Sequence, residues 1–577
     1  MPLSLSFAVP LLLFLLLFSG LSPTLGATSV SIKAATAIAK TDDNFVCATM
    51  DWWPPDKCNY GMCPWGNASI LNLDLGNPIL VNALKAFGSL RIRIGGSLQD
   101  QVSYQVGDSA HACPDFKVDK HGLFGFTEGC LPMQRWDELN RLFNSTGSII
   151  SFGLNALAGR SKSNSSGNLY EGRWDPTNAR DFIEYTLSKN YAVESWELGD
   201  CHSNSEQLFL ISALCFLVHP LGNELSGSGV SASVDAVQYG KDMIALKNVI
   251  DDVYGRSKQH PKLLAPGGFF DEKWFADMLR TSGPGVVDAV THHIYNLGPA
   301  YALRRAPVFT RILWSGNDKD LIRKIQDPYY LDQVAQTFDD ALSTVRQFGP
   351  WSSPWIGESG GAYNSGGKNV SNAFVDSFWY LDQLGMASTY DHKVYCRQAL
   401  IGGNYCLLDT TTFVPNPDFY RFVPHNLRDS GVTLLLINLS NSTAFDVAVT
   451  SDLNLYPPRS GGSSSASANE QGQQGEREEY HLTARGGDLR SSEMLLNGKL
   501  LKLTPSFEIP NMEPSIVGAG APLSIAPLSI AFVGFKDFKA PASHLTWKAN
   551  LQAFPARIKR FRDPPAGPSG PATGNET

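Results

Sequence analysis

Eight short runs rich in β-forming residues alternate with longer amphipathic stretches through residues 45–403, and this rhythm constrains the fold more than any other feature. Such alternation is typical of βα units around a parallel sheet. Eight units predict an α/β fold, a (β/α)8 TIM barrel over residues 45–425. The predicted strands are FVCATM (45–50), LRIRIGG (90–96), SIISFGL (148–154), AVESWELG (192–199), KLLAPGG (262–268), VVDAVTHHIY (286–295), PWIGESGG (354–361) and KVYCRQALIGG (393–403).

A second domain is predicted after residue 425. The strands GVTLLLINLS, AFDVAVTSDL and PLSIAFVGF follow one another with no helical period between them, which predicts an accessory all-β sandwich over residues 426–545. Residues 28–44 also have a strand pattern and are expected to join this sandwich. The Ser/Gly/Gln/Glu-rich residues 459–478 predict a mobile loop, and residues 546–577 a disordered tail.

The chain begins with an apolar run over residues 7–18, followed by small and turn-forming residues. This layout predicts a secretory signal peptide over residues 1–27, with the mature chain starting near Ala27 or Thr28. The alternative is a membrane anchor, but the run is short for a bilayer span of ~20 residues. We expect a secreted protein, extracellular or in a cell wall, with a lysosome- or vacuole-type compartment as the alternative.

Secretion permits disulfides and N-glycans. Of the 9 cysteines, five crowd the first part of the mature chain, and we expect pairing among Cys47, Cys58, Cys63, Cys113 and Cys130 in a connectivity that stays open. N-x-S/T sequons predict glycans on several of seven sites, namely Asn67, Asn144, Asn164, Asn369, Asn438, Asn441 and Asn575.

The net charge of -8 and the absence of a long Lys/Arg run argue against nucleic acid or an anionic membrane as a partner held by charge. A small neutral or weakly anionic substrate fits this balance better. We expect no transmembrane segment in the mature chain, and peripheral association with a membrane stays open.

Two glutamates follow predicted strands, and the active sites of such barrels lie at the C-terminal ends of the strands. They are Glu224 in GNELSG and Glu358 in WIGESGG, on the fourth and seventh strands. Retaining glycosidases use two facing carboxylates, ~5 to 5.5 Å apart, as general acid/base and nucleophile. We predict Glu224 as the acid/base and Glu358 as the nucleophile, with Asn223 donating to the sugar 2-hydroxyl. Either glutamate alone is equally explained as an ordinary loop carboxylate.

Several long motifs point to one family. The segments DDNFVCATMDWWPPDKCNYG, RIRIGGSLQDQ, LGNELSGSGV, THHIYNLG, WIGESGGAYNSGG and CRQALIGGNY resemble plant heparanase-like proteins, whose relatives are retaining β-glucuronidases and heparan-cleaving endoglucuronidases. The resemblance covers residues 28–425, and more weakly extends to about 542. It implies Glu224 as proton donor and Glu358 as nucleophile, oriented by Tyr295 or its neighbours His292 and His293.

The resemblance also implies a subsite for the glucuronate ring. Asp51 and Ser97 would line it, and Tyr405 with the backbone N–H groups of Gly366 and Gly367 would hold the substrate carboxylate, because a buried anion needs donors. For each aromatic or histidine taken alone, packing is the alternative role. We expect no metal or organic cofactor.

The chain departs from the family pattern where WELG should run directly into Asn223 and Glu224. Residues 200–222 intervene, an apolar and in-frame segment that we interpret as an unspliced plant intron, with a functional loop as the alternative. Pro220 fits a central strand poorly because it cannot donate to the ladder, so we expect the segment to loop out. Residues 300–315 are a second interruption, and about thirty residues after PNPDFY are missing by resemblance.

The predicted function is retaining hydrolysis of β-glucuronosyl linkages in glycans or small-molecule glucuronides. The alternative is a carbohydrate-binding pseudoenzyme whose interrupted site cannot turn over. The segments ATMDWW, GGSLQD, GNELSGSGV and GESGGAYNSGG contain no Lys or Arg, so we also expect weak dependence on substrate sulfation, with Lys241 and Arg397 as the nearest cations by sequence or as structural partners.

Overall fold

The structure of the chain is a computed structural model. It describes residues 25–33, 36–59, 61–111, 113–164, 168–199, 232–255, 257, 260–299, 303–304, 313–314, 319–421, 431–451, 475–518, 520–536, 538 and 559–561.

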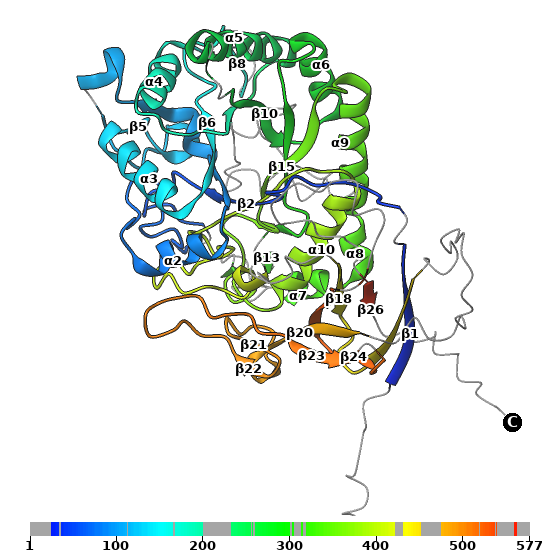
Figure 1. The fold of residues 1–577 in the computed structure, drawn as a ribbon. Helices are drawn as coiled ribbons and strands as arrows, with labels where there is room; N and C mark the ends of the chain where they lie inside the picture. Colours follow the sequence, from blue (N-terminus) through cyan, green and yellow to red (C-terminus); the bar gives the residue numbers. More distant parts are fainter. Residues whose placement is uncertain are drawn as a thin grey trace, which may run out of the picture.

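Eight parallel strands close into a barrel (Figure 1). Each of the eight predicted runs contributes one strand, so the predicted barrel is confirmed. Around the barrel the order is β2 (Val46–Met50), β3 (Arg91–Ile94), β6 (Ile149–Leu154), β9 (Ser195–Leu198), β10 (Lys262–Phe269), β11 (Ala289–Ile294), β15 (Ser353–Ser359) and β17 (Tyr395–Arg397), which pairs with β2.

Helices surround the barrel in Figure 1. Helix α5 buries Tyr239, Met243, Leu246 and Ile250, which recur at helical spacing and form one apolar stripe. Helix α3 ends at Gly147, whose φ of 71° is the left-handed conformation that glycine adopts without strain. The helices are α2 (Pro78–Ala86), α3 (Met133–Thr146), α4 (Thr177–Ser188), α5 (Ala236–Tyr254), α6 (Glu272–Ser282), α7 (Lys319–Ile325), α8 (Pro328–Asp332), α9 (Val334–Phe348) and α10 (Asp376–Thr389).

Short elements lie in the loops of the barrel domain, except for η8, which lies between β20 and β21 of the second domain. The second predicted interruption contributes an antiparallel ribbon of β13 and β14. The short elements are β4 (Val102–Tyr104), β5 (Gly129–Leu131), β7 (Ser161–Lys162), β8 (Tyr170–Glu171), β12 (Gly298–Pro299), β13 (Leu303–Arg304), β14 (Leu313–Trp314), β16 (Ala362–Tyr363) and the 3-10 helices η1 (Ser97–Gln101), η2 (Gly107–His111), η3 (Leu123–Gly125), η6 (Phe419–Arg421) and η8 (Arg485–Gly487).

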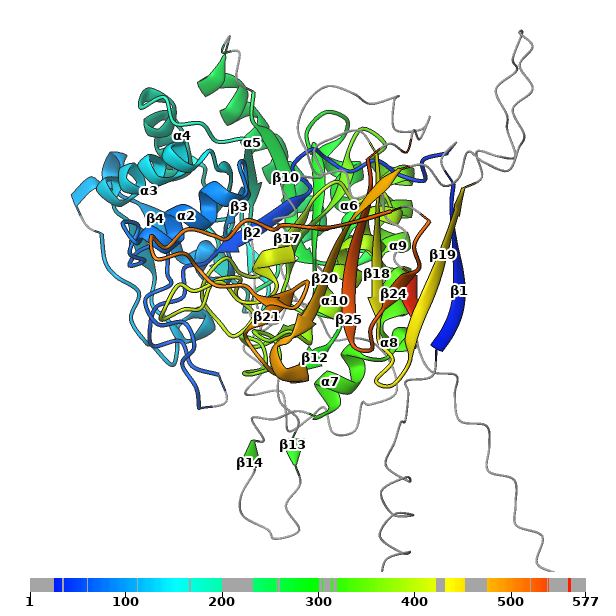
Figure 2. The ribbon, with the colours of Figure 1, turned by 60° about the horizontal axis from the view of Figure 1, so that its bottom comes forward.

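A second, sheet-rich domain follows the barrel, as predicted (Figure 2). One sheet holds β1 (Leu25–Ile32), β19 (Ala444–Ser451) and β24 (Leu523–Ile525). The other holds β18 (Val432–Asn438), β20 (Glu476–Ala484), β21 (Met494–Leu496), β22 (Lys499–Leu500), β23 (Ser515–Gly518), β25 (Ser529–Phe535) and β26 (Lys559–Phe561). Inward residues of both sheets, including Val30, Leu436, Val447 and Val533, share one apolar core.

The boundaries of this domain differ from the prediction at three places. Strand β1 pairs in parallel with β19 from Leu25 onward, so it includes residues on both sides of the predicted cleavage point. The predicted loop 459–478 overlaps β20, which begins at Glu476. The predicted disordered tail is wrong for Lys559–Phe561, which pairs with β18.

Three disulfides join described cysteines. Cys58 pairs with Cys63, and Cys113 pairs with Cys130. Cys47 pairs instead with Cys396, a cysteine that does not belong to the predicted N-terminal group. Cys47 and Cys396 lie opposite each other in register because closing the barrel makes β2 and β17 neighbours. Cys406 is buried and is not part of a disulfide.

Candidate active site

Glu358 lies near the C-terminal end of β15, and its side chain is fully buried. The pairing of β15 with β11 shifts register between Ile356 and Glu358, which is a local bulge of the kind that re-aims a side chain. The Tyr295 hydroxyl, just beyond β11, donates to Glu358 Oε1 at 2.5 Å. Arg93 Nη1, on β3, donates to Glu358 Oε2 at 3.2 Å. Two donors from two other strands therefore hold the carboxylate.

Arg93 also reaches a second carboxylate. Its Nε donates to Glu197 Oε2 on β9 at 2.6 Å, and all three side chains in this network are at most 2% exposed. Buried charges are stable only when paired, so the network holds together as a unit. Sequence reasoning missed both Arg93 and Glu197. The signal was present, because alternation places Arg91 and Arg93 on the same face of β3, where two arginines need acidic partners.

Asp51 follows β2 and is also buried. Its Oδ1 accepts from the backbone N–H of Trp52 at 2.6 Å, and its Oδ2 accepts from Gln398 Nε2 at 3.0 Å. A Cβ at Gly96 would lie 2.4 Å from this carboxylate, so the approach of the 95–96 turn requires glycine there. Gln398, which the sequence did not single out, also hydrogen-bonds Thr49.

Tyr405 lies beside this group. Burial raises the pKa of Tyr405 well above its usual value, and the neighbouring charges of Glu358 and Asp51 add to the rise. Its phenol is therefore protonated at neutral pH and available as a donor. The ring lies 6.5 Å from the Tyr295 ring, between centroids.

The predicted donors Gly366 and Gly367 lie in the loop next to Tyr405. A Cβ at Gly366 would come within 2.9 Å of the Tyr405 ring, which places the loop against it. The Gly367 N–H donates to Ser371 Oγ at 3.1 Å within the same turn. This N–H therefore has a partner within the loop, and its contact with a substrate carboxylate stays a prediction.

Ser97 begins η1 directly after the 95–96 turn and is fully buried. Within the described part of the chain, its hydroxyl has no hydrogen-bond partner. A buried hydroxyl without a partner is costly, and a bound hydroxyl or water would satisfy it.

The two neighbouring histidines point to opposite sides of β11. His293 faces β15, where a Cβ at Gly357 would lie 3.2 Å from its Nε2. His292 packs outside the barrel, with its Nε2 2.8 Å from His392 Nε2 and its ring against Phe338 of α9. Burial lowers the pKa of His292 to about 4. The prediction of His292 as a site residue is therefore wrong, because strand alternation turns it toward the helices.

Glu224 and Asn223 lie outside the described residues, as does the whole of 200–231. On the fourth strand, the description ends at Gly199, two residues after Glu197. The structure therefore positions the predicted nucleophile and leaves the predicted acid/base untested.

The expectation that Lys241 and Arg397 are the nearest cations is corrected by Arg93, which touches Glu358 directly. Arg397 is a structural partner, since its Nη2 lies 2.7 Å from Asp376 and 3.0 Å from Asp418. Lys241 is exposed on α5.

The asparagine side chains of the predicted glycosylation sites differ in their exposure to solvent. Asn438 is fully buried, and its Nδ2 donates to the carbonyls of Thr443, Ile525 and Ala526, so it does not fit a glycan. Asn575 lies outside the described residues. The exposed acceptors are Asn67, Asn144, Asn164, Asn369 and Asn441.

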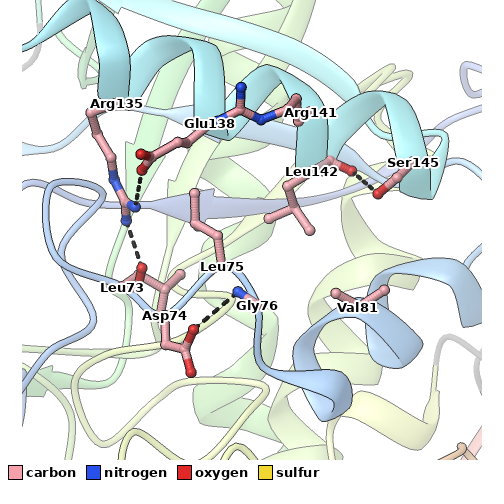
Figure 3. Close-up of a pocket in the computed structure, with 10 residues that line it drawn as sticks. All are labelled: Leu73, Asp74, Leu75, Gly76, Val81, Arg135, Glu138, Arg141, Leu142 and Ser145. Carbon is pink, nitrogen blue, oxygen red and sulfur yellow. Dashed lines mark hydrogen bonds and ion pairs between the residues drawn. The ribbon is translucent and has the colours of Figure 1, made fainter.

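A hollow of about 590 Å³ opens on the outside of the barrel (Figure 3). The loop before α2 and one face of α3 line it, and Arg135 crosses it to Glu138 and to the carbonyl of Leu73. None of the residues around Glu358 lines this hollow, so we do not assign the substrate site to it.

Two negative findings apply to the described part of the chain alone. No group of three or more His, Cys, Asp or Glu side chains there is arranged to hold a metal ion. None of its helices is long and apolar enough to cross a bilayer.

Comparison with known proteins decides the family. The profile described as "Glycosyl hydrolase family 79, N-terminal domain" matches residues 27–216 and 214–385. The chain belongs to glycosyl hydrolase family 79. The two parts of the family 79 match meet inside the segment 200–222, where the sequence indicated an insertion.

Family 79 relatives are similar over most of their length. "Heparanase-like protein 2" of Arabidopsis thaliana is 48% identical over 552 residues, which cover 89% of this chain and 95% of that protein. "Baicalin-beta-D-glucuronidase" of Scutellaria baicalensis is 34% identical, covering 86% of this chain and 90% of that protein.

A solved structure supports the fold. The 4-O-alpha-L-rhamnosyl-beta-D-glucuronidase from Fusarium oxysporum 12S has a TM-score of 0.54 at 13% identity, covering 89% of this chain and all of that chain. The comparisons give no support to the alternative of a binding protein without activity.

Proposed function

We propose that this family 79 glycoside hydrolase cleaves β-glucuronosyl linkages with retention, in glycans or in small-molecule glucuronides. The observation that carries the proposal is the Glu358 carboxylate, buried at a barrel strand end and held by Tyr295 and Arg93. The names of the relatives, a heparanase-like protein and a baicalin β-glucuronidase, support the substrate class.

In this mechanism Glu358 attacks the anomeric carbon and forms a covalent glycosyl ester, which water then hydrolyses. The Tyr295 hydroxyl fixes the attacking oxygen's direction, and Arg93 stabilises the carboxylate's charge. Glu224 would protonate the leaving oxygen and later activate the water, with Asn223 on the sugar 2-hydroxyl. Asp51 and Ser97 offer polar atoms to the sugar hydroxyls, and the protonated Tyr405 phenol offers a donor to the glucuronate carboxylate.

The test is release of 4-nitrophenol from its β-glucuronide by the purified chain, with Glu358→Gln as the inactive control. A second protein lacking residues 200–222 restores the family's spacing between WELG and Asn223 and measures what the insertion costs. Failure of both proteins to release more 4-nitrophenol than the control would overturn the proposed activity. Activity of the shortened protein alone would restrict the proposal to that form.

We also propose that the chain is secreted and N-glycosylated. The apolar leader, the exposed sequons and the three disulfides support an oxidising, glycosylating route. Expression in plant cells should yield protein whose mass falls on treatment with an N-glycanase, and peptide mapping should find Asn441 modified and Asn438 bare. Retention in the cytosol without glycans would contradict the proposal.

Weak dependence on substrate sulfation remains part of the proposal, on a revised argument. Arg93 is the cation at the site, but it already contacts two carboxylates and is poorly placed to recognise a sulfate. Unsulfated glucuronides should therefore compete at least as well as heparin in a competition assay.

A further inference from the structure

Three strands meet at one guanidinium in the barrel. Arg93 of β3 donates from Nε to Glu197 of β9 at 2.6 Å and from Nη1 to Glu358 of β15 at 3.2 Å. The shorter bond is to Glu197, which the proposed chemistry does not use. We infer that Glu197 is a positioning residue, which acts through Arg93 to set the direction and charge of the nucleophile. This inference rests on the proposed role of Glu358.

The geometry of arginine carries the first step. The guanidinium is planar with its donors in a fixed fork, so anchoring Nε also sets the direction of Nη1. Glu197 provides that anchor. Without it, the guanidinium could turn toward Glu358 and change both the position and the pairing of the attacking carboxylate.

Glu197 is itself held firmly. Strand β9 pairs on one side with β6 and on the other with β10, and Glu197 lies opposite Gly153 and Leu264. A Cβ at Gly267 would come within 3.1 Å of Glu197 Oε1, and Gly267 has a φ of 66°. The backbone of β10 therefore leaves room for this carboxylate where another residue would crowd it.

Charge gives the second step. A single arginine bonded only to the nucleophile would stabilise the resting carboxylate and weaken its attack. A second carboxylate on the same guanidinium shares the positive charge, so Glu358 keeps more of its negative charge for the anomeric carbon.

The chain offers a matched control at the N-terminal ends of the same two strands, where Arg91 begins β3 and Glu194 directly precedes β9. Arg91 Nη2 lies 3.2 Å from Glu194 Oε1, so this pair repeats the Arg93–Glu197 contact at the opposite end of β3. Glu194 has no contact with Glu358 in the described structure. Glu194→Gln therefore removes a carboxylate from a barrel arginine without touching the nucleophile's network.

The experiment labels Glu358 with 2-deoxy-2-fluoro-β-glucuronosyl fluoride. The Glu358 carboxylate oxygen forms an ester bond to the anomeric carbon while the C–F bond breaks and fluoride leaves with its electron pair. Fluoride leaves without a proton, so labelling does not need Glu224 as a general acid. The rate constant is read by intact mass, and the labelled residue by peptide mapping.

We expect Glu197→Gln to slow labelling by about 10- to 100-fold, the scale of a displaced catalytic group, and Glu194→Gln to change it by less than about 2-fold. The acid limb of the labelling rate should move to lower pH in Glu197→Gln, because Arg93 then faces one carboxylate fewer, and should stay in place in Glu194→Gln. A general loss of stability would not move this limb. Equal labelling rates and unmoved profiles would overturn the inference.

Two further outcomes are informative. If the unaltered chain is not labelled at Glu358, the proposed function fails rather than the role of Glu197. If thermal melting shows that Glu197→Gln is not folded, Glu197→Asp is tested in its place. This variant keeps the negative charge but shortens the side chain that reaches Arg93. Labelling of Glu197→Asp at the unaltered rate would overturn the inference.

Discussion

At both ends of the barrel an arginine of β3 pairs with a glutamate at β9, but the two pairs serve different purposes. At the N-terminal end, Arg91 lies 3.4 Å from Asp42 and 3.2 Å from Glu194, and Lys262 lies 2.6 Å from Glu194. Both cations lie over the Trp355 ring. At the C-terminal end, Arg93 contacts both the Glu197 and the Glu358 carboxylates.

The difference lies in charge and exposure. The N-terminal cluster matches two cations with two carboxylates that are 25% and 26% exposed, which is a stable arrangement. Burial raises the pKa of Glu194, but Arg91 and Lys262 outweigh it and lower the pKa overall. The C-terminal carboxylates are fully buried. Burying two carboxylates close together costs folding free energy, but a retaining glycosidase needs a buried carboxylate as its nucleophile. The N-terminal cluster therefore stabilises the barrel, and the C-terminal cluster carries the chemistry.

The largest expected effect is that of Glu358→Gln, which removes the nucleophile. Glucuronide hydrolysis should fall by roughly 10⁴- to 10⁶-fold, as for other nucleophile substitutions, while the melting temperature stays the same or rises because one buried charge is gone. Steady-state kinetics and thermal melting measure both. Glu194→Gln is the control and should keep its activity. Comparable activity loss in both variants would remove the distinction between the two ends.

The second expected effect is on stability. Arg91→Met keeps the apolar stem over Trp355 but leaves Asp42 and Glu194 without that cation, and should cost about 3–5 kcal/mol of the free energy of unfolding. Activity per folded molecule should remain. Urea unfolding and kcat at a temperature well below the melting point test this, with Arg91→Lys as the conservative control. A stable but inactive Arg91→Met variant would show that the N-terminal cluster takes part in the chemistry.

Much of this arrangement was predictable from the sequence. The eight strands followed from their composition and spacing, and Glu358 was found because barrel sites lie at strand ends. Tyr295 came from the family resemblance, as one of three alternatives with His292 and His293. The Cys47–Cys396 disulfide was missed because the cysteines were grouped by sequence, whereas barrel closure joins the first strand to the last.

The interior charges were harder to predict. Arg93 and Glu197 were counted as ordinary strand residues, since pairing across a barrel depends on register that no local pattern gives. His292 and His293 could not be assigned to faces for a similar reason, because the bulge opposite them shifts the pairing with β15. Asn438 matched a sequon, and only the packing of β18 against the 525–526 turn revealed that its amide is already used.

The third prediction concerns pH and lies on the outer face of β11. Burial lowers the pKa of His292 to about 4 and that of His392 well below its usual value. Below pH ~6.5 these histidines bind protons in the unfolded chain but stay neutral in the folded chain. The free energy of unfolding therefore falls as the pH drops from about 6.5 to 4, by on the order of 3 kcal/mol for His292.

Urea unfolding at pH 7, 5.5 and 4 measures this loss. His292→Phe keeps a ring against Phe338 and should flatten the pH dependence in this window, while Glu358→Gln should not. Within the described residues, the ionisable side chain that contacts His292 is His392, in the loop between α10 and β17, so the double variant His292→Phe with His392→Phe checks the coupling. An unchanged slope would show that the pair does not carry the pH dependence.

The smallest expected effect separates orientation from charge at the catalytic end. Tyr295→Phe removes the 2.5 Å hydrogen bond to Glu358 Oε1 but leaves Arg93 on Oε2 and keeps the ring beside Tyr405. A hydrogen bond to a charged group contributes about 1.5–3 kcal/mol, so kcat should fall by about 10- to 100-fold. KM should change little, because the hydroxyl contacts the nucleophile rather than the substrate. Steady-state kinetics give both constants, and thermal melting checks that the fold is kept. If KM rises while kcat holds, the Tyr295 hydroxyl binds substrate instead, and orientation of Glu358 at this end of the barrel belongs to Arg93 alone.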